Sequence, residues 1–160
     1  MPGKSSIPDP LEKRDLLYSK EGDRGVDLVA LGDAYRDAGR FTEAVQFYNR
    51  AQAEDSLAEL KDLVIDRGDS ALLLTIQRVL KNGVKAADWK RLAESALRKE
   101  KYSAAAEAFE KAGEEEAAAE AKAKLDELLQ TVKQPEPIAD PDDPDDPTPG
   151  QAGHQTRMGG

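Results

Sequence analysis

LVALGDAYRDAGRFTEAVQFYNRAQ, residues 28–52, has the pattern of two short amphipathic helices separated by a turn. Its apolar and small residues recur at intervals of three and four, which places them on one face of each helix. Ala38-Gly39-Arg40 separates the two runs, and glycine commonly ends a helix. Gly32 lies inside the first run, where glycine costs about 1 kcal/mol relative to alanine. We therefore expect another helix to approach closely at Gly32.

A second segment, WKRLAESALRKEKYSAAAEAFEKA (residues 89–112), repeats this pattern at a constant offset of 61 residues. Leu28, Leu31, Gly32, Tyr35, Ala44, Tyr48 and Ala51 correspond to Trp89, Leu92, Ala93, Ala96, Ala105, Phe109 and Ala112. A shared offset over so many positions indicates an internal repeat, and repeated helix pairs typically form binding surfaces. Trp89 begins an apolar stripe, so we expect it to be buried.

The intervening segment, LAELKDLVIDRGDSALLLTIQRVLKNG (residues 57–83), also predicts helix, turn and helix. Aligning Gly68 with Gly39 puts Leu57, Leu60, Val64, Leu73 and Leu80 on the matched apolar positions. Lys61 then replaces the small residue and Gln77 the aromatic one. Asp69 or Ser70 is expected to cap the second of these helices.

This register resembles that of the tetratricopeptide repeat (TPR) family, with Ala93 and Glu100 standing where the family favours glycine. The resemblance implies an all-α fold: a short superhelical solenoid of antiparallel helical hairpins with terminal capping helices. Since the third turn lacks glycine, we expect ordinary backbone dihedrals at Glu100 and Lys101. In the family, the first helix of each hairpin lines a concave groove. The corresponding positions here are Val29, Asp33, Arg36, Asp37, Ala58, Asp62, Ile65, Asp66, Lys90, Glu94, Leu97 and Arg98.

The flanking segments complete the predicted organisation. Residues 1–8 and the acidic, Pro/Asp-rich tail 133–160, with a net charge of −4, have too few large apolar residues to form a core and are predicted to be disordered. Between them, residues 9–132 form the TPR-like helical domain. Its first helix is expected to begin at Asp9-Pro10 and to carry an apolar stripe of Leu11, Leu16, Leu17 and Tyr18. Gly113 separates the third hairpin from the last helix, residues 114–132, which is expected to cap that hairpin.

Composition and charge argue against several classes of protein. The chain of 160 residues has no cysteine and a net charge of −9. This charge disfavours binding to nucleic acid, and no apolar run approaches the roughly 18 residues of a membrane span. The start, MPGKSSIPDPLEKR, lacks the apolar stretch of a secretory signal, so we expect a cytoplasmic protein with no membrane association.

The sequence gives little support for a catalytic or metal-binding role of any residue. The sole histidine, His154, lies in the predicted tail, which could not hold a general base in place. The Asp pairs at 142–143 and 145–146 lack the spacing of a calcium loop, and a solvating acidic tail is the simpler interpretation. The final Gly159-Gly160 resembles the end of ubiquitin-like modifiers, but the chain has no strand pattern to form their β-grasp fold. We therefore expect no cofactor, no metal and no enzymatic activity.

The sequence favours a non-catalytic protein–protein interaction module, an adaptor or assembly scaffold, that binds a peptide or helix in its groove. Val29 and Asp33 stand where the family's carboxylate clamp requires lysine and asparagine, which argues against an acidic chaperone tail as the ligand. The alternative is a structural protein whose repeats form a homo-oligomer. Attraction between the acidic tail and the basic cluster Lys90, Arg91, Arg98, Lys99 and Lys101 would modulate either role.

Overall fold

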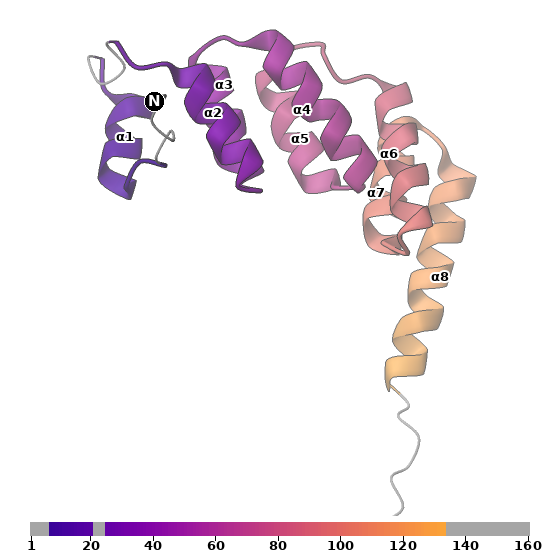
Figure 1. Cartoon of the computed structure of the whole chain (residues 1–160). Helices are drawn as coiled ribbons and strands as arrows, with labels where there is room; N and C mark the ends of the chain where they lie inside the picture. Colours follow the sequence, from indigo (N-terminus) through magenta and orange to yellow (C-terminus); the bar gives the residue numbers. More distant parts are fainter. Residues whose placement is uncertain (1–6, 21–24, 134–160) are drawn as a thin grey trace, which may run out of the picture. The chain divides into compact units, whose positions relative to one another are not determined.

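The computed structural model describes residues 7–20 and 25–133, and these contain eight α-helices and no β-strand (Figure 1). The helices are α1 (Pro10–Tyr18), α2 (Leu28–Asp37), α3 (Phe41–Arg50), α4 (Glu54–Arg67), α5 (Ser70–Val79), α6 (Ala86–Arg98), α7 (Tyr102–Ala112) and α8 (Glu115–Lys133). The prediction of an all-α chain is confirmed for these residues. The chain divides into two units, Met1–Leu125 and Asp126–Gly160, and the boundary falls inside α8.

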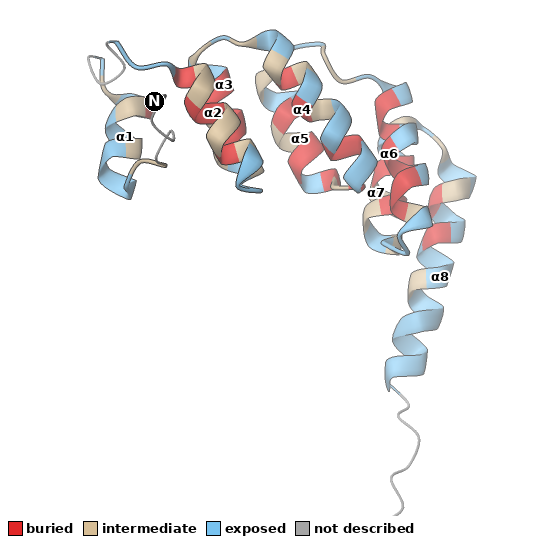
Figure 2. Ribbon diagram, viewed as in Figure 1, coloured by how far each residue is buried: buried red, intermediate tan, exposed pale blue. Residues whose placement is uncertain are grey.

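Within the first unit, the helices pack in consecutive pairs: α2 on α3, α4 on α5, and α6 on α7. Further contacts join α4 to α6 and to α3, and join α5 to α3 and to α7. Helix α1 contacts α3. Figure 2 shows the buried residues concentrated on the helix faces that meet within and between these pairs.

The core consists of the apolar positions that recur in the sequence. Leu60, Leu73 and Leu92 are fully buried, and Trp89 is only 3% exposed, so the predicted burial of Trp89 is confirmed. Gly32 lies against Tyr48: a Cβ atom on Gly32 would stand 2.4 Å from Cε1 of the Tyr48 ring. The mid-helix glycine is therefore required by close packing of α2 on α3.

The three turns that join the paired helices share one backbone conformation. Gly39, Gly68 and Glu100 have φ values of 75°, 65° and 58°. In each turn the amide of the following residue donates to a carbonyl five residues earlier, the arrangement that ends many helices in a left-handed residue. The bonds are Arg40 N to Tyr35 O (2.8 Å), Asp69 N to Val64 O (3.3 Å) and Lys101 N to Ala96 O (2.9 Å).

The expectation of ordinary dihedrals in the third turn is therefore wrong at Glu100. The same hydrogen bonds close this turn, so its geometry imposes a left-handed residue whatever the side chain. A non-glycine residue in this region is unfavourable because its Cβ crowds the backbone. Glu100 is exposed, so its side chain meets no additional packing constraint.

Capping residues mark several of the predicted helix boundaries. The Asp9 carboxylate accepts hydrogen bonds from the amides of Leu11 and Glu12, which confirms the start of α1. Asp69, rather than Ser70, caps α5 by accepting from the Leu72 amide at 3.0 Å.

The outermost helices are less buried than the sequence suggests. In α1 only Leu17 is buried, while Leu11 and Tyr18 are 65% and 73% exposed, so the predicted apolar stripe does not pack as a unit. In α8 only Ala118 and Ala121 are buried. Leu128, Leu129 and Val132, in the last turns of α8, are exposed.

Several predictions concern residues outside the described ranges. They are the disorder expected for most of 1–8 and of the tail 133–160, and the assignments made for His154, the Asp pairs at 142–146 and Gly159-Gly160. Within residues 7–20 and 25–133, no helix has both the length and the apolar character needed to cross a membrane.

Candidate functional site

The predicted groove residues occupy α2, α4 and α6, the first helices of the three pairs. The side chains of these residues differ in solvent exposure, which distinguishes those on the surface from those in the core. Asp37, Asp62, Asp66, Lys90, Glu94 and Arg98 are exposed, while Val29, Asp33, Arg36, Ala58 and Leu97 are half-buried. We call these exposed and half-buried residues, without Ile65, the first-helix face. Ile65 is the exception: it is 1% exposed and belongs to the core, so its assignment to a binding surface is wrong.

On α2, the charged side chains of the face are bonded to one another. Arg36 lies between two carboxylates, with Nη1 3.3 Å from Asp33 Oδ1 and Nε 3.2 Å from Asp37 Oδ1. The buried Tyr48 hydroxyl donates to Asp33 Oδ1 at 2.6 Å from α3 below. Burial, and then this hydrogen bond to Asp33, raise the pKa of Tyr48 above its ordinary value. The Asp33 carboxylate is thus held in place from the core side.

Polar bonds join α4 directly to α6. At the carboxyl end of α4, the Ser95 hydroxyl and the Lys99 ammonium donate to the Asp66 carbonyl oxygen at 2.7 and 2.5 Å. Farther along the pair, Arg91 Nη1 lies 3.4 Å from Asp62 Oδ1. Cations at the carboxyl end of a helix also compensate its dipole. These bonds place the exposed positions of α4 and α6 side by side.

In the sequence, Lys61 differs from the repeat because it stands where the other two repeats have a small residue. Its ammonium lies 3.3 Å from Asp88 Oδ2 and 3.1 Å from the Gly83 carbonyl oxygen, and both charged side chains are largely buried. The Lys85 amide also donates to Asp88 Oδ2, at 3.0 Å. The position equivalent to Gly32 of the first repeat is therefore occupied by a lysine, and its ammonium bonds α4 to the start of α6.

The beginning of α6 is bonded to the beginning of α8. The Lys90 ammonium donates to Glu114 Oε1 at 2.7 Å, and this hydrogen bond raises the pKa of Lys90. Glu114 therefore links the start of α8 to α6.

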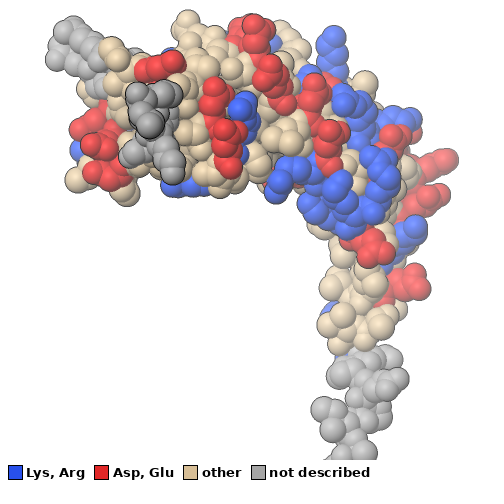
Figure 3. All heavy atoms as spheres, in the orientation of Figure 1, with Lys and Arg blue, Asp and Glu red and all other residues tan. Residues whose placement is uncertain are grey.

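Charge is unevenly distributed over the molecule. Figure 3 shows carboxylates over α2 and α4 and a concentration of lysine and arginine over α6 and the α6–α7 turn. The exposed cations of that segment are Lys90, Arg91, Arg98, Lys99 and Lys101. The first-helix face is consequently acidic along α2 and α4 and mainly basic along α6.

No catalytic constellation is evident on this face. Within the described part of the chain, no three carboxylate, histidine or cysteine side chains are grouped so that they could hold a metal ion. Arg36 is paired with Asp33 and Asp37 on its own helix, and Asp62 and Lys90 are paired with Arg91 and Glu114, which lie outside the face.

The chain matches no protein-family model, and it has no significant match among curated proteins or solved structures.

Proposed function

We propose that this chain is a TPR-like solenoid whose first-helix face binds a peptide or a helix of another protein, without catalysis. The observation that carries the proposal is the left-handed turn repeated at Gly39, Gly68 and Glu100, which matches the offsets of the apolar pattern. Stacked helical repeats form extended binding surfaces. In this chain α4 packs on α6, its equivalent in the third pair, and meets the first pair through α3.

The chemistry of the first-helix face indicates the kind of partner. Val29 and Leu97 offer partly exposed apolar surface, and the carboxylates of Asp37, Asp62 and Asp66 add negative charge along α2 and α4. A segment that carries basic side chains beside apolar ones complements this part of the face. Electrostatic complementarity of this kind mainly sets the association rate and the specificity.

The proposal is tested by selecting peptides from a displayed random library against the full chain, and by mapping the selected peptide with amide chemical shifts. A double reversal, Asp66→Lys with Glu94→Lys, alters two exposed carboxylates of the face. Glu115→Lys with Glu120→Lys makes the same charge change on exposed positions of α8. We expect the first variant to lose binding of a basic peptide and the control to retain it. Equal binding by both variants, or shifts confined to other helices, would contradict the proposal.

A structural homo-oligomer remains the alternative function. The exposed apolar residues Leu128, Leu129 and Val132 favour it, because such residues clustered on one short segment are commonly covered by a partner. Light scattering on the full chain distinguishes the two functions: a monomer at micromolar concentration would exclude a stable oligomer as the working form.

A further inference from the structure

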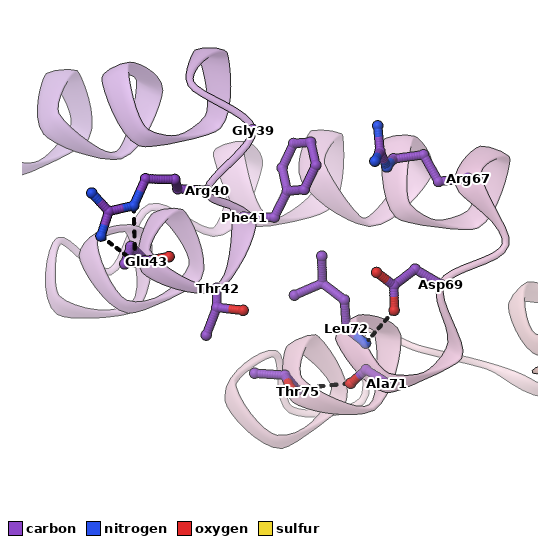
Figure 4. Close-up of a pocket in the computed structure, with 10 residues that line it drawn as sticks. All are labelled: Gly39, Arg40, Phe41, Thr42, Glu43, Arg67, Asp69, Ala71, Leu72 and Thr75. Atoms are coloured by element: carbon purple, nitrogen blue, oxygen red, sulfur yellow. Dashed lines mark hydrogen bonds and ion pairs between the residues drawn. The ribbon is translucent and has the colours of Figure 1, made fainter.

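A hollow of about 420 Å³ opens between the α2–α3 turn and the start of α5, and none of its lining residues belongs to the first-helix face (Figure 4). We call it the turn pocket. Its lining comes from two segments separated by more than twenty residues of sequence. These are Gly39, Arg40, Phe41, Thr42 and Glu43 from the first pair, and Arg67, Asp69, Ala71, Leu72 and Thr75 from the second.

The inner part of the turn pocket is apolar. Leu72 is only 7% exposed, and Phe41 is half-buried against the core. Figure 4 shows the Leu72 side chain directed toward the space beneath the Phe41 ring. An aliphatic side chain placed there would bury apolar surface against both residues, which is favourable in proportion to the area removed from water.

Three of the four charged groups that line the turn pocket are engaged within the protein. Arg40 Nε donates to Glu43 Oε1 at 3.0 Å. The Asp69 carboxylate accepts from the Leu72 amide. Burial alone would raise the pKa of Glu43, but hydrogen bonds, first of all that from Arg40, together with the positive charges of Arg40 and Lys13 lower it below its ordinary value. Glu43 is therefore ionised at neutral pH.

The fourth group, the Arg67 guanidinium, forms no ion pair within the described residues. It lies over the Phe41 ring, 4.8 Å from the ring centre. A guanidinium on an aromatic face is positioned in advance and keeps donors on its edge for a carboxylate. Within the described residues, the turn pocket thus has one cation without an ion-pair partner, next to its apolar inner part.

We propose that the turn pocket binds an internal peptide segment in which a glutamate or aspartate side chain neighbours an aliphatic one. The carboxylate pairs with Arg67, and the aliphatic side chain packs between Phe41 and Leu72. The carboxylates of Glu43 and Asp69 disfavour a ligand with two or more negative charges, such as a phosphate group. This site is separate from the first-helix face and takes a ligand of opposite charge preference.

The probe is the peptide Gly-Ser-Glu-Leu-Ser-Gly, acetylated and amidated so that its only charge is the glutamate side chain. It is titrated into the full chain at low salt and followed by amide chemical shifts. The comparison peptide has glutamine in place of glutamate. We expect the glutamate peptide to shift the amides of Phe41, Thr42 and Leu72 and to bind about tenfold more tightly than the glutamine peptide, as a charge-assisted hydrogen bond would give. High salt should reduce this ratio.

The matched variants are Arg67→Gln and Arg78→Gln, since Arg78 is an exposed arginine of α5 outside the turn pocket. Arg67→Gln should weaken binding of the glutamate peptide about tenfold. Arg67→Lys should weaken it less, and Arg78→Gln should leave it unchanged. Circular dichroism confirms that each variant is folded. Equal binding of the two peptides, or no effect of Arg67→Gln, would overturn the proposal. Shifts confined to the residues of the first-helix face, with none at Phe41, Arg67 or Leu72, would also overturn it, while leaving the first-helix face as a binding site.

Discussion

Replacing Gly68 by alanine should cost considerably more stability than the same change at Gly39, although both glycines end a helix with positive φ. Both substitutions place a Cβ in the left-handed region, which costs about 1–2 kcal/mol. At Gly39 the new atom meets nothing within 4 Å, so this is the whole expected cost. At Gly68 it would stand 2.8 Å from Ala96 Cα and 3.0 Å from Ala96 N.

The contact at Gly68 is with the backbone of α6, which cannot move aside as a flexible side chain would. Overpacking of this kind adds about 1–3 kcal/mol, so Gly68→Ala should cost about 2–5 kcal/mol in total. The measurement is urea denaturation of the full-length variants, followed by far-ultraviolet circular dichroism and by Trp89 fluorescence. Equal losses in the two variants would contradict the close approach of α4 to α6 at Gly68. A larger loss for Gly39→Ala would refute the reasoning altogether.

Five further substitutions test other parts of the structure. Glu100→Gly should raise the free energy of unfolding by about 1 kcal/mol, since it relieves a left-handed residue; thermal melting of the variant measures this. Trp89→Ala should cost about 3–5 kcal/mol, and native Trp89 fluorescence should be blue-shifted; an emission maximum typical of exposed tryptophan would contradict its burial. Asp88→Ala should destabilise more than Lys61→Met in chemical denaturation, since it leaves a largely buried ammonium without its carboxylate. Because the folded protein binds the Tyr48 proton more tightly than the unfolded chain, stability should be full below the ordinary pKa of 10.0 and fall as the pH rises above it. Tyr48→Phe should reduce that fall, as shown by melting temperatures on both sides of pH 10.

The helices from α2 to α7 were predictable because their apolar residues recur with helical spacing, and because Gly68, Asp69 and Gly113 mark some of their ends. The close approach at Gly32 followed from its position inside an apolar stripe. The positive φ of Glu100 could not be predicted from residue type, because the hydrogen bonds of the turn impose this conformation. Ile65 lies in the core although its equivalent on α2, Arg36, is only half-buried, because an isoleucine at this position of α4 packs against neighbouring apolar residues.

Features formed by distant residues were the least predictable. The Lys61–Asp88 pair joins residues 27 positions apart, and each residue alone resembles ordinary surface charge. The turn pocket likewise depends on how the α2–α3 turn meets the start of α5, which no local pattern encodes. The exposure of Leu11, Tyr18 and Leu128 also depends on where the neighbouring helices end. An amphipathic pattern indicates which face would be buried, but not whether another element covers it.

The bonds from α6 and its following turn to the end of α4 have a consequence for cooperativity. The carbonyl oxygens of Asp66 and Arg67 receive their donors from Ser95, Lys99 and Lys101. If residues 85–133 unfolded alone, these carbonyl groups would lose their partners at the same time as Lys61 lost Asp88. The α4–α5 pair would therefore lose stability at the same step, so that a partly unfolded state retaining only α1 to α5 is disfavoured, and the second and third pairs unfold together.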